Sequence, residues 1–162
     1  MNTVKTESAA TYAATTNVAE DAIIAQAMSI LESRLRTKTT TFTSPNQSKQ
    51  FVRCKLQQLE HEVFSVLFLD NQNYLIEYTE MFRGTIDSAS VYPREVAKAA
   101  LELNAAAVIF AHNHPSGISV PSSADRNITN KLKSALELFD IRVLDHIIIG
   151  DTTYSFAESG LI

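Results

Sequence analysis

Apolar residues recur every three or four positions in four segments of the chain, and this spacing predicts four amphipathic helices. The segments are residues 20–35, 45–60, 93–103 and 128–139. Two of them carry a start signal, because Pro45 follows Ser44 and Pro93 opens an apolar stripe. Serine is a good N-cap, and proline fits the first helical turn, where its missing N–H costs no hydrogen bond.

Short continuous apolar runs predict the strands. Residues 63–69 and 74–78 flank a polar, turn-like segment from Asp70 to Asn73, which is typical of a hairpin. Further strands are expected at residues 82–86, 105–111, 141–149 and 153–156. An antiparallel hairpin joined to strands that alternate with helices predicts an α/β domain with a mixed central sheet flanked by helices.

The same patterns divide the chain into three parts. Residues 1–18 hold few large apolar side chains and are expected to form a disordered tail. Residues 19–59 are expected to form an N-terminal helical segment with a polar linker, and residues 60–162 a single folded domain. With 162 residues, of which 45% are hydrophobic, the chain has enough apolar material for one core.

Composition narrows the class of protein. The formal net charge is −4, so no overall positive charge attracts nucleic acid, and DNA binding is doubtful. No apolar run approaches the roughly 20 residues that span a bilayer, and the N-terminus lacks the apolar centre of a secretion signal. The single cysteine, Cys54, has no partner for an internal disulfide. These features predict a soluble cytoplasmic protein with no membrane association, and they do not specify its oligomeric state.

The residues with the clearest chemical potential follow the strand expected at 105–111. His112 and His114 stand two positions apart, and Asp125 lies in the first turn of the next helix. If the backbone turns near Pro115, both imidazoles and the carboxylate can bind one zinc ion. Three protein ligands leave one position for water, which is the arrangement of a catalytic zinc site.

Two pairs of residues have alternative interpretations. The spacing from Ser122 to Asp125 also matches a capping box, which stabilises the start of a helix and needs no metal. Asp145 and His146 lie in an apolar strand. They are either a buried hydrogen-bonded pair or an outer support for the metal ligands.

These residues resemble a known motif. His112-x-His114, with Asp125 eleven residues after His114 and Ser122 three residues before Asp125, resembles the JAMM motif of the JAB/MPN superfamily. More narrowly, about residues 60–162 resemble the RadC-like family, on the segments 91–95, 112–117 and 145–150. The resemblance implies a single MPN/JAB-type domain, similar to the cytidine-deaminase-like architecture, with a zinc metallopeptidase or metalloisopeptidase site.

The resemblance also implies roles for individual residues. In the family a glutamate precedes a strand of the form Glu-x-Phe-x-Val-Leu, which implies Glu62 as the general base, with Glu60 as the competing carboxylate. Ser122 is implied to donate a hydrogen bond to a zinc-bound water or to the oxyanion of the substrate. The implied reaction is hydrolysis of a peptide or isopeptide bond, in an unidentified protein or peptide substrate, by attack of the zinc-bound water.

Other functions are either excluded or left as alternatives. A zinc nucleobase deaminase needs a Pro-Cys-x-x-Cys segment, and a chain with one cysteine has none. A non-catalytic MPN interaction module and a DNA-repair or recombination accessory protein are the alternatives. RadC-like proteins usually carry an N-terminal helix-hairpin-helix region, whereas residues 1–59 show no glycine-bearing hairpin between basic helices, which weakens the DNA alternative.

Overall fold

The computed structural model describes residues 9–36, 41–42, 44–84 and 90–162. The chain divides into two compact units, residues 1–39 and 40–162, and helix α1 (Ala9–Arg36) is the described part of the first. This helix begins before the expected start at Glu20 and includes residues 9–18 of the expected tail, whereas residues 1–8 lie outside the described residues. The segment is rich in alanine, which has the highest helix propensity although it adds little apolar surface.

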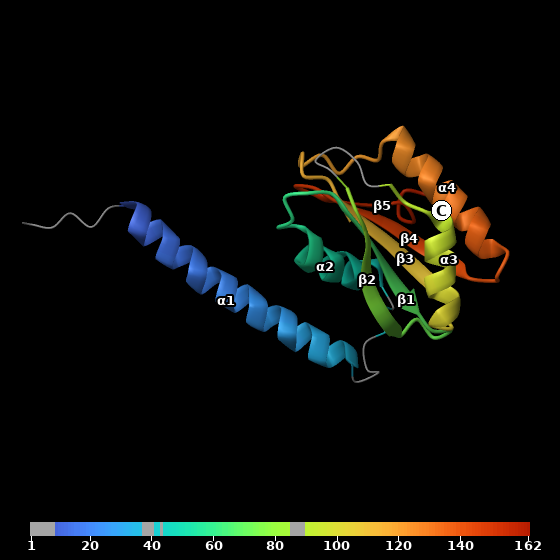
Figure 1. The fold of residues 1–162 in the computed structure, drawn as a ribbon, viewed down its shortest axis with the longest axis horizontal. Coiled ribbons are helices and arrows are strands. Elements are labelled where there is room, and N and C mark those ends of the chain that lie inside the picture. Colours follow the sequence, from blue (N-terminus) through green and yellow to red (C-terminus); the bar gives the residue numbers. More distant parts are fainter. Residues whose placement is uncertain (1–8, 37–40, 43, 85–89) are drawn as a thin grey trace, which may run out of the picture. The chain divides into compact units, whose positions relative to one another are not determined.

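The second unit is built on a five-stranded sheet in the order β2-β1-β3-β4-β5 (Figure 1). Its strands are β1 (Val63–Leu69), β2 (Leu75–Arg83), β3 (Ala107–Asn113), β4 (Arg142–Ile149) and β5 (Thr153–Ser155). Strand β1 pairs antiparallel with β2 and β3, β3 pairs parallel with β4, and β5 returns antiparallel to β4. The α/β class and the mixed central sheet expected from the sequence are therefore confirmed.

Helices cover both faces of this sheet (Figure 1). Helix α2 (Pro45–Leu56) packs against β3, β4 and β5 on one face, and α3 (Pro93–Glu102) and α4 (Ser123–Glu137) contact each other on the opposite face. Successive side chains of a strand point to opposite faces of the sheet. Every second residue of β1 therefore points to the same face, and Phe64, Val66 and Phe68 all join the core beneath α3 and α4. The unit therefore has three layers, with the sheet in the middle.

The compact unit begins at Thr40 rather than at residue 60, where the domain was expected to start. The reason is that α2 belongs to the layered packing and not to a linker. Its side chains Phe51, Val52 and Leu56 are buried. An apolar helix face needs a partner surface, and here the sheet supplies it.

Several element ends differ from the sequence prediction. Helix α2 ends at Leu56 rather than at residue 60, and β3 runs from Ala107 to Asn113 rather than over residues 105–111. The strand expected at residues 82–86 is the end of β2, which continues to Arg83 because β1 offers it a partner as far as Val63; residues 85–89 lie outside the described residues. The last helix ends at Glu137, before Phe139. No helix in the described part of the chain is long and apolar enough to cross a membrane.

Candidate metal centre

Strand β3 extends far enough to carry the first histidine. His112 and Asn113 are its last two residues, and the His114 N–H donates to the Ile149 carbonyl at 2.8 Å, which prolongs the pairing with β4. Because side chains alternate along a strand, His112 and His114 project from the same side of the sheet, and their ring centroids lie 4.7 Å apart. The chain turns only afterwards, where the Gly117 N–H donates to the His114 carbonyl at 2.9 Å. The expected turn therefore follows both histidines and is not what aims them.

Asp125 reaches the same point from the first turn of α4. Its Oδ2 accepts hydrogen bonds from the Ser122 N–H at 2.7 Å and the Ser122 hydroxyl at 2.6 Å, and its own N–H donates to the Ser122 Oγ at 3.2 Å. These contacts form the capping box that the spacing predicted. The cap does not compete with a metal-ligand role, because it occupies Oδ2 and leaves Oδ1 directed at His112.

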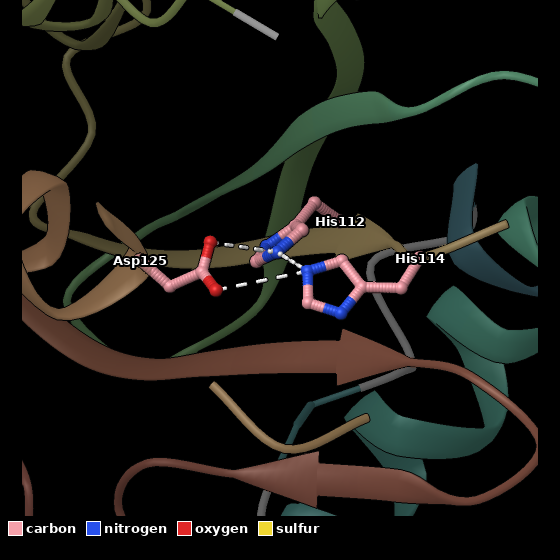
Figure 2. Close-up of side chains that lie close together, drawn as sticks. All are labelled: His112, His114 and Asp125. Atoms are coloured by element: carbon pink, nitrogen blue, oxygen red, sulfur yellow. Dashed lines mark hydrogen bonds and ion pairs between the residues drawn. The ribbon is translucent and has the colours of Figure 1, made fainter. Parts of the chain in front are cut away.

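The three side chains converge on one small volume (Figure 2). The Nε2 atoms of His112 and His114 are 2.9 Å apart. Asp125 Oδ1 lies 3.1 Å from the His112 Nε2, and Asp125 Oδ2 lies 3.7 Å from the His114 Nε2. One potential ligand atom from each residue thus falls within 4.8 Å of the other two.

The hydrogen bond of His114 shows which of its nitrogens is available to a metal. Its Nδ1 lies 2.6 Å from the Ile118 carbonyl oxygen, which only accepts hydrogen bonds, so Nδ1 carries the proton. In the neutral form of the ring, Nε2 then presents a lone pair to His112 and Asp125. Two imidazole nitrogens and one carboxylate are a donor set that suits zinc, and atoms bound to one zinc ion stand roughly 3 to 3.5 Å apart. The residues present therefore fit a zinc ion.

The electrostatics of the site favour an ionised carboxylate at Asp125 and a neutral ring at His146. Burial by itself would raise the pKa of Asp125. When His112 is protonated, its hydrogen bond and positive charge act against burial, and together with the hydrogen bonds from Ser122 they hold this pKa well below its ordinary value. His146 lies behind His112, and its pKa is held well below the ordinary value, first by burial and then by the positive charge that His112 carries when protonated. Asp125 is accordingly ionised and His146 neutral at neutral pH.

The model of one protein family, described as the RadC-like JAB domain, matches residues 42–161 of the chain. The chain belongs to this family. The match includes α2, in agreement with the compact unit that begins at Thr40. The family and the MPN-type fold implied by the sequence resemblance are therefore confirmed.

Two relatives show how far the likeness extends. A UPF0758 protein of Vibrio cholerae serotype O1 is 60% identical over 141 residues, which cover 87% of this chain and 89% of that protein. A UPF0758 protein of Pseudoalteromonas translucida is 63% identical over 122 residues, which cover 75% of this chain and 54% of that protein. The RadC-like chain thus spans most of the first relative and about half of the second.

Asn113 holds the segment that carries the two candidate general bases of this RadC-like domain. Its Oδ1 accepts a hydrogen bond from the Val63 N–H at 2.8 Å, and its Nδ2 donates to the carbonyls of Leu59 at 3.2 Å and His61 at 3.0 Å. These bonds tie the chain before β1 to the end of β3. Residues 60–62 are therefore placed beside the histidines, although the sequence analysis did not single out Asn113.

The two glutamates differ in their relation to the sheet. Strands β1 and β3 pair Phe64 with His112, and Glu62 stands two residues before Phe64, just outside β1. If the alternation of the strand continues to Glu62, its side chain lies on the same side of the sheet as His112. Glu60 lies in the loop before β1 and lines a cleft next to His114. Neither carboxylate belongs to the cluster of metal-ligating atoms, and both roles stay predictions.

The cleft adjoins the RadC-like site at His114, and neither His112 nor Asp125 lines it. It has a volume of about 410 Å³ and is lined by residues 57–60, 113–115, 117 and 149–151. These residues come from the segment that follows α2, from the adjoining ends of the parallel strands β3 and β4, and from the loops that follow these strands. Ligands commonly bind at the carboxyl ends of parallel strands.

Two side chains behind the ligands complete the site. His146, for which the sequence left two interpretations, contacts the Nδ1 of His112 at 2.8 Å. Thr129, which the sequence analysis did not single out, contacts the other nitrogen of His146 at 2.6 Å. The available signal for Thr129 was its position one helical turn after Asp125, which places both residues on the same face of α4.

Proposed function

We propose that this RadC-like domain is a zinc-dependent hydrolase that cleaves a peptide or isopeptide bond. The observation that carries the proposal is the convergence of His112, His114 and Asp125 on one point, with a lone pair of His114 directed inward. A structural zinc site is closed by four protein ligands, whereas three leave a position for water or substrate. The described residues supply three.

Access to the site is asymmetric, which supports a catalytic role. The His112 side chain is 2% exposed, whereas those of Asp125 and His114 are 12% and 16% exposed. Of these three residues, His114 is the most exposed and is the one that lines the cleft. A substrate chain in this cleft would bring its carbonyl group next to His114.

The chemistry divides between the metal and the protein. A zinc ion, when bound, supplies a Lewis acid and lowers the pKa of a coordinated water to about 7. Glu62 is proposed to take the proton of the attacking water and to deliver it to the departing amine. Its position two residues before Phe64, the strand partner of His112, supports this role, and Glu60, on the wall of the cleft, is the alternative.

Ser122 is proposed to steady the oxyanion that forms from the substrate carbonyl. In the structure its hydroxyl donates to Asp125 Oδ2 at 2.6 Å. A donation to the oxyanion therefore requires the hydroxyl to rotate away from Asp125. The Ser122 N–H, which also donates to Oδ2, keeps the carboxylate oriented during that rotation.

Comparison of Glu62→Gln with Glu60→Gln tests the proposal. Glutamine keeps the shape of the side chain and removes its basic oxygen, so zinc content and melting temperature of both variants should match wild type. Hydrolysis of peptide and isopeptide substrates, measured on zinc-loaded protein, should fall by roughly 10² to 10⁴-fold in Glu62→Gln and little in Glu60→Gln.

Three outcomes contradict parts of this scheme. A loss of activity in Glu60→Gln alone would move the general base to Glu60 and leave the hydrolase proposal standing. Full activity in both variants would reject the proton-transfer mechanism. Zinc-loaded wild type that cleaves no bond in broad peptide and isopeptide libraries would favour a non-catalytic interaction module.

A further inference from the structure

His146 occupies an apolar compartment in which each of its nitrogens needs a defined partner. The residue lies on β4 and is fully buried. Its ring centroid is 5.5 Å from that of Phe64, 5.9 Å from that of Phe110 and 4.9 Å from that of Phe156. A polar group among such rings is costly unless it is hydrogen-bonded.

Three short contacts connect His146 to two of the metal-ligating residues. The Thr129 hydroxyl oxygen lies 2.6 Å from the Asp125 main-chain carbonyl and 2.6 Å from the His146 Nδ1. The His146 Nε2 lies 2.8 Å from the His112 Nδ1. The contacts run from α4 through β4 to β3, and we call this chain of four residues the relay.

The main-chain carbonyl of Asp125, at one end of the relay, fixes the direction of every hydrogen bond in it. A carbonyl oxygen only accepts, so the single proton of the Thr129 hydroxyl points to Asp125. The hydroxyl oxygen must then accept from a proton on the His146 Nδ1. A neutral imidazole with a proton on Nδ1 has an acceptor at Nε2, which therefore accepts from His112.

The relay therefore fixes the tautomer of His112, the first candidate metal ligand. In the neutral ring of His112, Nδ1 carries the proton and the lone pair stands on Nε2, which lies 3.1 Å from Asp125 Oδ1 and 2.9 Å from the His114 Nε2. The opposite direction would place the proton of His112 on Nε2 and block that atom for a metal. One backbone carbonyl thus decides the chemical form of a ring three hydrogen bonds away.

We propose that His146 and Thr129 are positioning residues that hold His112 in the tautomer able to bind a metal through Nε2. The relay ends on the main chain of Asp125, so it also couples the position of this ligand to that of His112. The inference deepens the proposed function and rests on it for the identity of the metal. The relay itself consists only of the protein's own atoms.

Zinc affinity, measured with zinc alone against a competing chelator, tests the relay in four variants. His146→Phe keeps a flat ring among Phe64, Phe110 and Phe156 but removes both nitrogens, and zinc affinity should fall roughly 10 to 100-fold, the usual effect of an outer partner of a metal ligand. His146→Gln restores an acceptor for His112 and a donor for Thr129, so it should recover most of the loss.

Thr129→Val removes only the hydroxyl and should weaken zinc binding by about 10-fold. Its matched control is Ser48→Ala, because Ser48 is also a buried helical residue whose hydroxyl donates to a carbonyl four residues earlier, that of Ser44, at 3.5 Å. Ser48→Ala should leave zinc affinity unchanged. Circular dichroism identifies any variant that does not fold.

The tautomer is measured directly by long-range ¹H–¹⁵N NMR of metal-free wild type, in which protonated and unprotonated imidazole nitrogens are resolved. The expected spectrum has the proton on Nδ1 in both His112 and His146, and Thr129→Val should populate the other tautomer of His146. A purely structural role for His146 would not produce this change.

Several results would overturn the inference. A neutral His112 ring with its proton on Nε2 and none on Nδ1 in metal-free wild type would do so, and so would unchanged zinc affinity in folded His146→Phe or in Thr129→Val. If His146→Phe does not fold, Thr129→Val and the wild-type spectrum decide. If zinc binds but no bond is hydrolysed, the proposed function is rejected and the relay stands. If zinc does not bind, the proposed zinc site is rejected, and the NMR measurement of the tautomer then tests the relay.

Discussion

Two buried aspartates of the second unit have opposite surroundings. Asp145 on β4 accepts hydrogen bonds on both oxygens, at Oδ1 from the His146 and Ala157 N–H groups and at Oδ2 from the Ser155 hydroxyl. Asp125 accepts its bonds from Ser122 on Oδ2, and its Oδ1 faces the ring nitrogen of a metal-ligand candidate. One carboxylate is surrounded by donors and the other is open on one side.

The comparison shows that burial and hydrogen bonding by themselves do not identify a metal ligand. Both side chains are buried, and both are held by neighbouring backbone and hydroxyl groups. They differ in pKa: burial raises that of Asp145 despite its hydrogen bonds, whereas His112 and Ser122 hold that of Asp125 below its ordinary value. A carboxylate is suited to a metal when one oxygen is oriented by the protein and the other meets additional ligands.

The largest expected effect is on zinc binding by Asp125→Asn. The asparagine amide carries no charge and is a weaker zinc ligand than the carboxylate. Zinc affinity should therefore fall by more than the roughly 10 to 100-fold expected for an outer partner of a metal ligand. The matched variant Asp145→Asn should bind zinc like wild type, because its amide can still accept from the His146 and Ala157 N–H groups and donate to Ser155. Zinc content after dialysis checks both variants. Equal losses in the two would remove the distinction between the aspartates.

A smaller effect is expected on the stability of the protein when the helix cap that orients Asp125 is removed. Ser122→Ala removes an N-cap that accepts from the Asp125 N–H and donates to its carboxylate, and should cost about 1 kcal/mol of unfolding free energy. The matched variant is Ser44→Ala at the start of α2, where the N-cap side chain makes no capping hydrogen bond. It should cost much less. Urea unfolding of metal-free protein compares them, and similar costs in both variants would contradict a stabilising cap at Ser122.

The smallest effect is the pH dependence that Asp145 contributes to stability. Its folded pKa is raised, so the folded state binds the proton more tightly than the unfolded state does. The resulting stabilisation is present below the ordinary pKa of about 4 and is lost as pH rises through the folded pKa. Asp145→Asn should therefore gain stability relative to wild type as pH rises above about 4. Urea unfolding of both metal-free proteins across this range measures the difference, and a constant difference would contradict the raised pKa.

Local sequence patterns determined most of the secondary structure. The apolar runs gave the strand order along the chain, and Pro45 and Pro93 marked the first residues of α2 and α3. These features depend on residues within about one helical turn or one strand of each other, which is the range over which periodicity and capping act. The early start of α1 was missed because alanine favours a helix without forming an apolar stripe.

The site was predicted as far as its residues are close in sequence. The spacing of His112, His114 and Asp125 indicated a metal centre, and the capping box that carries Asp125 is itself a local pattern. The resemblance to the RadC-like family added Glu62, and the pairing of Phe64 with His112 supports its placement. The catalytic roles of Glu62 and Ser122 stay predictions.

Only the tertiary structure decided how distant elements meet. The place of α2 in the domain depends on a sheet whose strands β3, β4 and β5 come much later in the chain. The relay joins His112, Thr129 and His146, which come together because β3 and β4 pair in parallel and α4 crosses between them. Hydrogen bonds between separate elements depend on register and crossover geometry, and no local periodicity encodes these. The sequence by itself therefore determined which side chains could bind a metal, whereas the packing of α4 against β4 decided which nitrogen of His112 faces it.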